Sequence, residues 1–252
     1  MTVFSCERNW EAMLTCIYDA WASKLGHKNI RLMLEPIEQY TLFDEYIHVE
    51  PDYAKAESVM DAINMKISPM VYKELLYESM AYEDDVLQNI YLVLILGFAY
   101  GPNVLDMVSY EPVMRSAEIR KRLGNEAHKF VEFLRFHEIR KSVYVAHIEP
   151  KSHVLLTVAE AFSDRMPSEY WMVVDDVHKE AVVHPKDEDY YIRKLTDEEF
   201  ERLLETEKEN DEYTDLWKTF FNSIAIKERE NYRCQRNLFP LWTRKHAVEF
   251  MN

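Results

Sequence analysis

The sequence predicts an α+β protein with a mostly helical first part, a small mixed β-sheet unit and a C-terminal helix with a basic tail. Two changes in apolar periodicity predict this class. Apolar residues recur about every 3.6 positions through most of the chain up to Lys141, and from Ser142 they alternate with a period of about 2. The helical period returns at Leu216. We therefore expect residues 1–252 to form a single compact domain with three parts, residues 1–141, 142–205 and 206–252.

Composition narrows the class of protein. An apolar content of 48% in 252 residues is typical of a globular chain. No apolar run approaches the roughly 20 residues that span a bilayer, and the N-terminus has no secretion signal. The three cysteines form neither a CxxC motif nor a metal-ligand spacing. We therefore expect a cytoplasmic protein with reduced thiols, no membrane partner, no bound metal and no cofactor.

The first part begins with a β-prone run at Thr2–Cys6, followed by a helix that Asn9 caps. Residues 29–49 are β-prone and broken by Pro36, so they predict either strands or an extended arm. Three further helices and a short helical turn follow, at residues 51–67, 68–80, 84–97 and 104–108.

A long amphipathic helix is predicted from Pro112 to about Lys141, and the rest of the chain is organised around its segment Gly124–Phe136. Its apolar stripe is expected to be buried; it consists of Ile119, Leu123, Ala127, Phe130 and Leu134. Gly124 is unfavourable inside a helix by roughly 1 kcal/mol relative to alanine. It therefore indicates either a close backbone approach or a break between two helices.

From Ser142 the pattern predicts a β-α-β-β-β unit, with the segment Asp175–Glu180 as a hairpin turn. Thr196 and Glu199 have the spacing of a helix capping box. A last long helix is expected over residues 216–230, followed by the basic tail. The elements of the β-α-β-β-β unit are expected at residues 143–148, 154–164, 170–174, 181–184 and 190–192.

The net charge of −15 argues against nucleic acid, but the distribution of charge changes that expectation. The segments Arg115–Lys141 and Lys227–His246 each carry a net charge of +4. Two basic segments in an acidic chain favour a local anionic partner. The alternative is that they pair internally with the acidic stretch Asp187–Asp215.

Three residues are candidates for catalytic chemistry. Glu126 and His128, together with Glu132, lie close on the long helix and could act as acid and base, although Glu126 could equally pair with Arg122 one turn earlier. Asp175, with Asp176, follows a strand and could bind a divalent ion, but Asp is more common there as a turn residue. The His147-Ile-Glu149 sequence imitates a zinc deaminase motif whose cysteine partners are absent, which favours a simple strand end.

Four ordered motifs, GPNVLD, GNEAHKFVEFLRF, AHIEPKSHVLLTVAEAFSDRMP and WKTFFNSIAIKERENYRCQRNLFP, begin at residues 101, 124, 146 and 217. Through them the chain resembles a bacterial family of uncharacterised domains described as DNA metabolism or DNA repair proteins. The resemblance implies a radical SAM DNA repair protein as partner and, in other bacteria, fusion to a uracil-DNA glycosylase-like domain. The chain departs from the family pattern at Glu230 and Tyr232, where a basic residue and a proline are common.

The expected function is therefore that of an accessory protein that engages single-stranded or damaged DNA and works with a radical SAM enzyme. The alternatives are a hydrolytic DNA-processing enzyme, such as a nuclease or glycosylase-like protein, and an adaptor that binds protein only. Trp242 and Phe239 could stack on an unpaired base. The residues expected to contact DNA are Arg122, His128, Lys129, Arg135, Arg229, Arg233, Gln235, Arg236 and Trp242.

Overall fold

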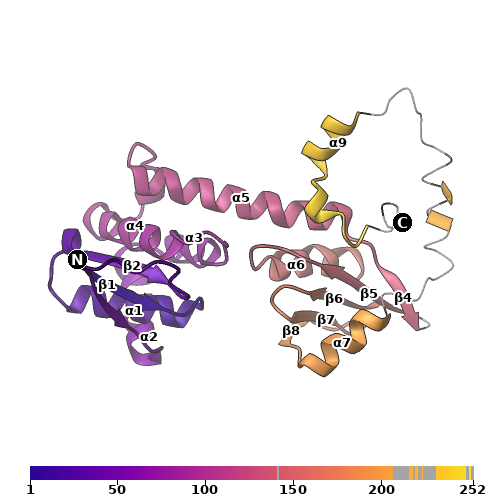
Figure 1. The fold of residues 1–252 in the computed structure, drawn as a ribbon, viewed down its shortest axis with the longest axis horizontal. Helices are drawn as coiled ribbons and strands as arrows, with labels where there is room; N and C mark the ends of the chain where they lie inside the picture. The colour runs from indigo at the N-terminus through magenta and orange to yellow at the C-terminus, as the bar shows by residue number, and fades with distance from the viewer. Residues whose placement is uncertain are drawn as a thin grey trace. The chain divides into compact units, whose positions relative to one another are not determined.

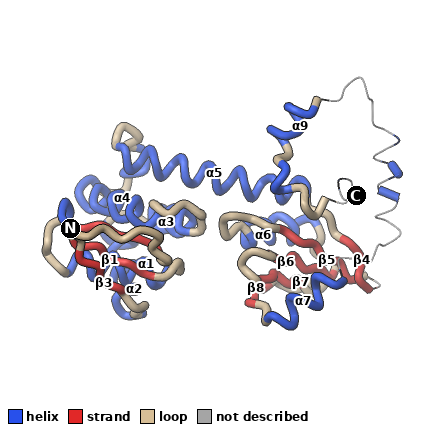
Figure 2. The backbone as a smooth tube through the Cα atoms, viewed as in Figure 1, coloured by secondary structure: helices blue, strands red, loops and turns tan. Residues whose placement is uncertain are grey.

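The computed structural model describes residues 1–140, 142–206, 216–217, 219–220, 223, 231–247 and 250. Helices and two small sheets confirm the α+β class (Figures 1 and 2). The chain divides into two compact units, unit 1 (residues 1–123) and unit 2 (residues 124–252). We had expected one compact domain with an internal change at Ser142. The division lies instead within helix α5 (Glu111–Phe133), so that this helix contributes to both units.

Unit 1 contains a three-stranded sheet in the order β2-β1-β3, in which β2 and β3 both pair with β1 in parallel. The stretch that predicted strands or an arm therefore forms two strands. Helix α1 begins after Asn9, whose side chain accepts a hydrogen bond from the Ala12 amide, as the capping prediction required. The elements are β1 (Thr2–Cys6), α1 (Trp10–Ala22), β2 (Ile30–Leu34), β3 (Glu45–His48), α2 (Tyr53–Lys66), α3 (Pro69–Ser79) and α4 (Val86–Tyr100), with short 3-10 turns at His27–Asn29 and Val104–Asp106.

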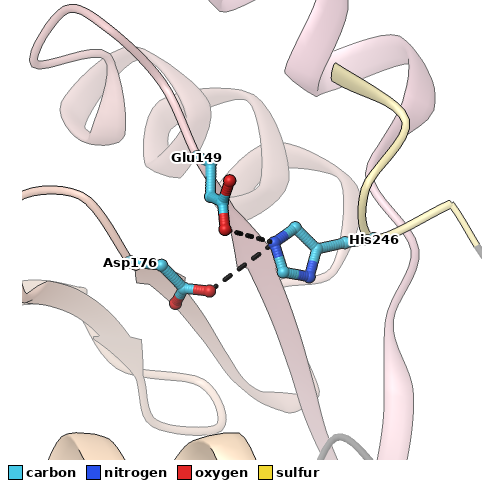
Figure 3. A group of neighbouring side chains, drawn as sticks. All are labelled: Glu149, Asp176 and His246. Atoms are coloured by element: carbon cyan, nitrogen blue, oxygen red, sulfur yellow. Dashed lines mark ion pairs between the residues drawn. The ribbon is translucent and has the colours of Figure 1, made fainter. Parts of the chain in front are cut away.

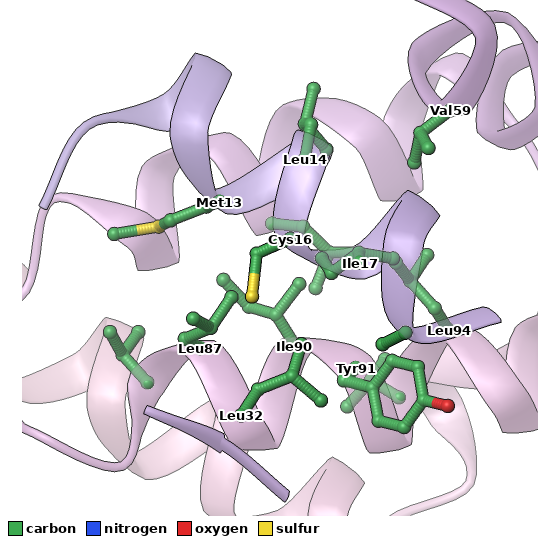
Figure 4. Packing of buried hydrophobic residues seen from close by; sticks show 14 of the residues in the cluster. Met13, Leu14, Cys16, Ile17, Leu32, Val59, Leu87, Ile90, Tyr91 and Leu94 are labelled. Carbon is green, nitrogen blue, oxygen red and sulfur yellow. The ribbon is translucent and has the colours of Figure 1, made fainter. Parts of the chain in front are cut away.

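The core of unit 1 lies between β1, β2 and the helices, where Ile17, Leu32 and Ile90 are almost completely buried (Figure 4). Close packing against Ile67 explains why residue 97, within α4, is a glycine. A Cβ atom there would lie 2.7 Å from Cδ1 of Ile67, so the absence of a side chain permits close packing at this point.

Helix α5 is continuous through Gly124, so the predicted alternative of a break at this glycine is wrong. Leu123 and Phe130 on its apolar stripe are buried, as expected, and Leu134 just beyond its end is half-buried. The prediction that the helix continues to Lys141 is also wrong. The chain instead forms β4 (His137–Arg140), which pairs antiparallel with the next strand and packs Ile139 against the unit 2 core.

Unit 2 contains a five-stranded sheet in the order β4-β5-β6-β7-β8. Strands β5 and β6 are parallel and are joined by helix α6, whereas the other neighbours are antiparallel. The predicted β-α-β-β-β unit is therefore confirmed, with β4 as an additional edge strand. Its elements are β5 (Val143–Ile148), α6 (Leu155–Arg165), β6 (Tyr170–Asp175), β7 (Glu180–His184) and β8 (Tyr191–Lys194).

Two helices cover opposite faces of this sheet. Phe162 of α6 contacts Trp171 on β6, with ring centroids 6.4 Å apart. Phe200 of α7 (Asp197–Thr206) packs against the cluster that includes Val174. Trp171 and Val174 point to opposite faces because they are an odd number of residues apart on one strand. The start of α7 has the predicted capping box, since Glu199 accepts from the Thr196 amide at 3.0 Å.

The tail contains helix α9 (Tyr232–Leu238) and a 3-10 turn at Leu241–Thr243. It folds back onto the C-terminal end of α5, where Phe239 stacks on Phe133. The helix predicted over residues 216–230 lies for the most part outside the described residues. Within the part of the chain that the structure describes, no helix combines the length and apolar character needed to cross a membrane.

Candidate functional site

Two lysines of unit 2 lie close to the ring of Trp242 in the tail. The Lys129 Nζ of α5 is 5.9 Å from the centre of the indole ring, and the Lys151 Nζ is 5.6 Å from it. Phe130 contacts the same ring edge to face at 5.9 Å. The indole remains 38% exposed. The arrangement therefore presents an aromatic ring with two positive charges beside it, on a buried aromatic support.

The other expected DNA contacts on α5, and Arg135 just beyond its end, have different surroundings. Arg122 belongs to unit 1, where its guanidinium lies 3.6 Å from Glu83 and 3.8 Å from Glu118. The Arg135 guanidinium lies over the Trp217 ring at 5.2 Å. Of the cations predicted on this helix, the structure brings Lys129 together with Trp242.

Arg233 and Arg236 are exposed on α9, whereas Gln235 is held within the tail. The Gln235 carbonyl accepts from Arg244, which also donates to the Phe239 carbonyl. Burial, followed by the like charge of Arg236, lowers the pKa of Arg244. Arg229 lies outside the described residues.

Phe239 does not have the exposure that base stacking requires. Its side chain is only 5% exposed, and its ring stacks on Phe133 at a centroid distance of 4.0 Å. The expectation that Phe239 contacts a base is therefore wrong, because the ring is used to hold the tail on α5. Trp242 is the exposed aromatic of the pair.

The candidate catalytic residue Glu126 is buried and holds a loop in place. Its carboxylate accepts hydrogen bonds from the backbone amide of Lys151 at 2.6 Å and from the Ser152 hydroxyl at 2.7 Å. The ion pair that the sequence suggested between Glu126 and Arg122 is replaced by these contacts. Glu126 thereby fixes the segment that carries Lys151 beside Trp242.

His128 and Asp175 also have local structural partners. The exposed His128 ring lies 3.1 Å from Glu132, one turn along α5. Asp175 accepts from the amides of Val177 and His178, both at 3.0 Å, and its other oxygen is 2.6 Å from Nδ1 of His178. These contacts are typical of a carboxylate that closes a turn.

A cluster of two carboxylates and one imidazole lies at the end of the parallel strand pair (Figure 3). Glu149 directly follows β5, and Asp176 directly follows β6. The Nε2 atom of His246, from the tail, lies 3.6 Å from Glu149 and 3.5 Å from Asp176. The carboxyl ends of parallel strands are the usual place for ligand sites in open α/β sheets.

His147 extends this cluster. Its Nδ1 lies 2.8 Å from Asp176, and its ring stacks near that of His246 with centroids 5.8 Å apart. Since a carboxylate accepts and does not donate, Nδ1 carries the proton of this hydrogen bond. The Nε2 atom of His147 is buried and has no hydrogen-bond partner among the described residues.

A small cavity connects the two features. It has a volume of about 10 Å³, close to the space that one water molecule occupies. His147, Glu149 and His246 of the ionisable cluster line it, and so do the aromatic residues Phe130 and Trp242. The exposed ring and the ionisable cluster are therefore parts of one site in unit 2.

The sequence did not reveal this combination. It singled out His147 and Glu149 as a motif and Asp176 as a possible ligand, but it favoured a strand end and a turn. The sequence identified Lys245 only as one charge of a basic segment. It did not single out Lys151 or His246. The parallel pairing of β5 with β6 and the return of the tail bring these residues together, and neither is encoded in a local spacing.

Comparison with family models shows a match to the domain of unknown function DUF4130 over residues 84–249, about two thirds of the chain. A comparison with curated proteins gave no match.

Proposed function

The chain belongs to the DUF4130 family, and from that premise we propose that it is an accessory protein of DNA repair or DNA metabolism that engages DNA through unit 2. The observation that carries this proposal is that the Lys129 and Lys151 ammonium groups both lie within 5.9 Å of the centre of the exposed Trp242 ring. An exposed indole with two ammonium groups nearby suits an unpaired base next to its backbone phosphates.

The energy of base stacking favours single-stranded or damaged DNA over duplex DNA as the ligand. Stacking of a base on an aromatic side chain contributes about 1–3 kcal/mol, and every base can stack because each has a π-face. A base within a duplex is already stacked on its neighbours, so it must leave the helix before it reaches Trp242. The exposed Arg233 and Arg236 of the same tail would add phosphate contacts.

The proposed partner is a radical SAM DNA repair protein, in the cytoplasm, as the family resemblance implies. Among the cysteines of this chain, Cys6 and Cys16 are buried in unit 1 and Cys234 is exposed on α9. A [4Fe–4S] cluster needs several thiolates around one point, so in this proposal the radical chemistry belongs to the partner. Size-exclusion chromatography of the two purified proteins, alone and mixed, tests whether they form a complex.

Fluorescence anisotropy with a labelled single-stranded oligonucleotide tests the DNA proposal. We expect saturable binding that Trp242→Ala weakens about tenfold, in line with the stacking energy of one base. Trp21→Ala, at a similarly exposed tryptophan of unit 1, is the matched control and should leave the affinity unchanged.

Two results would contradict the proposal: no saturable binding by the wild-type chain, or equal losses from the Trp242 and Trp21 variants. A chain that binds the radical SAM protein but no oligonucleotide would be an adaptor that binds protein only.

A hydrolytic DNA-processing enzyme is the second candidate, and the cavity shared by Trp242, His147 and Glu149 is the observation that favours it. A base or phosphate held by Trp242 would lie next to groups that can move a proton. Incubation with end-labelled oligonucleotides, including one that contains uracil, would reveal strand cleavage or base release on a denaturing gel. Glu149→Gln should abolish any product, and unchanged substrate with the wild-type chain would exclude this candidate for the strands tested.

A further inference from the structure

We infer that Glu149, Asp176 and His246 form a binding site for one divalent transition-metal ion of the zinc class, with His147 as the residue that positions Asp176. This inference goes beyond the DNA-binding proposal and depends on none of its residues. Imidazole nitrogen and carboxylate oxygen are both ordinary zinc ligands, and three protein ligands with an open fourth position are typical of reactive zinc sites.

The distances between the ligand atoms support the inference. Zinc binds nitrogen and oxygen at about 2.0–2.2 Å, so two ligands in a tetrahedral arrangement lie about 3.4 Å apart. The Nε2 atom of His246 lies 3.6 Å from the Glu149 carboxylate and 3.5 Å from the Asp176 carboxylate. One ligand atom from each of the three residues lies within 4.8 Å of the others. A small movement of the Glu149 and Asp176 carboxylates toward each other would therefore complete the tetrahedral geometry.

The charge and burial of these three side chains also support a metal site. The side chains of Asp176 and His246 are only 7% and 13% exposed, and Glu149 is 26% exposed. Two neighbouring carboxylates in a partly buried place need positive charge nearby. Lys245 pairs with Glu149 from an exposed position, 65% accessible, where solvent weakens the attraction. A divalent ion would neutralise both carboxylates and release this lysine to solvent.

His147 provides an independent observation. Its Nδ1 is hydrogen-bonded to Asp176, which leaves the Nε2 atom with a lone pair when the ring is neutral. His147 lines the same cavity as Glu149 and His246, and its buried Nε2 atom has no hydrogen-bond partner among the described residues. Outer partners of this kind orient metal ligands in known sites, and their loss costs about 10- to 100-fold in metal affinity.

Calorimetric titration of zinc chloride into chelator-treated, dialysed full-length protein tests the site. We expect one equivalent of zinc to bind, and magnesium chloride to give no comparable heat, because magnesium prefers oxygen ligands alone. Glu149→Gln and Asp176→Asn keep the size of each side chain and should each weaken zinc binding about tenfold or more. His246→Ala should do the same.

Matched controls separate this site from adventitious zinc binding. His128→Ala removes an exposed histidine of α5, and Glu132→Gln changes the exposed carboxylate beside it. Both should retain the wild-type zinc affinity. Circular dichroism and melting in the presence of chelator verify that every variant is folded.

The inference is overturned if the wild-type chain binds no zinc. It is also overturned if Asp176→Asn binds zinc as tightly as the wild type, or if His128→Ala loses as much binding as His246→Ala. If the wild-type chain binds no zinc, the contacts of His246 with Glu149 and Asp176 serve only to hold the tail in place. Because no DNA is present in this experiment, its result is separate from that of the oligonucleotide measurements.

Discussion

Phe239 stacks on Phe133 with ring centroids 4.0 Å apart and planes inclined by 15°. This contact fixes the tail of unit 2 on the C-terminal end of α5. Phe130, three residues before Phe133 on α5, contacts Trp242 at 5.9 Å. Two successive aromatic contacts therefore set the position of Trp242, and Arg244 reinforces them by its hydrogen bond to the Phe239 carbonyl.

Replacement of Phe239 by alanine should release the tail. A large-to-small change at a buried aromatic costs about 3–5 kcal/mol in unfolding free energy. We expect a loss of this size in urea denaturation, with faster proteolysis of the tail. Leu238→Ala, at the adjacent and 66% exposed position, is the control and should change little. Equal stabilities of the two variants would show that the stacking does not hold the tail.

Phe130→Ala should also lower the unfolding free energy by about 3–5 kcal/mol. Phe130 is only 5% exposed and contacts the Trp242 ring edge to face. His128→Ala, two residues earlier on the exposed face, should leave the melting curve nearly unchanged. A melting curve unaffected by the Phe130 change would contradict the assignment of this face of α5 to the core.

Arg233→Ala and Arg236→Ala should each reduce the salt dependence of DNA binding and leave stability intact, because both side chains are exposed. For single strands the slope of log affinity against log salt is about 0.7 per neutralised phosphate, so each variant should flatten it by up to this amount. Binding at a series of salt concentrations measures the slope. A loss of thermal stability with an unchanged slope would indicate instead that these arginines pin the tail.

Glu126→Ala should destabilise unit 2 without removing any catalytic group. It leaves the Lys151 amide and the buried Ser152 hydroxyl without their acceptor, which costs about 1–3 kcal/mol. Chemical denaturation measures this loss, and Glu132→Ala at an exposed position is its control. If Glu126 acted as a catalytic acid or base, Glu126→Gln would retain stability while abolishing a reaction on DNA.

Glu78 in unit 1 should make stability depend on pH. Burial is the largest influence and raises the pKa of Glu78, while hydrogen bonds from Ser116 and Asn89 and the charge of Arg120 oppose it. The folded state therefore binds this proton more tightly than the unfolded state. The stability that Glu78 contributes is complete below its ordinary pKa of 4.5 and is lost as pH rises through the higher folded value.

The measurement for Glu78 is urea denaturation from about pH 5 to about pH 8. The advantage of the wild type over Glu78→Gln should shrink as pH rises. Glu74→Gln, on the same helix and partly exposed, should show no such trend relative to the wild type. A wild-type advantage that grows with pH would mean that Glu78 is held as a carboxylate by its donors.

Local rules predicted most of the fold. Asn9 and Thr196 mark helix starts because a side-chain oxygen accepts from an amide within three residues, a contact that depends only on sequence neighbours. The end of α5 was missed for the opposite reason. Residues 137–140 were assigned to the helix by extension of the pattern that precedes them. They form β4 instead, which pairs with β5 and packs Ile139 against the unit 2 core.

The candidate site could be predicted only in part. Lys129 and Trp242 were expected to contact the same ligand. Glu149, Asp176 and His246 were not grouped because they come from two strand ends and the tail, so their proximity depends on sheet register. Phe239 was assigned to a ligand because an aromatic side chain in a basic tail suits either base stacking or core packing.

The hydrogen bonds of Arg244 to the carbonyls of Gln235 and Phe239 tie the end of α9 to the turn that follows. Trp242 and His246 lie on either side of this arginine and therefore share one short segment. Zinc on His246 and a base on Trp242 would both favour the docked position of that segment over any other. Binding of the two ligands would then be thermodynamically linked, and each would raise the affinity for the other by the same factor.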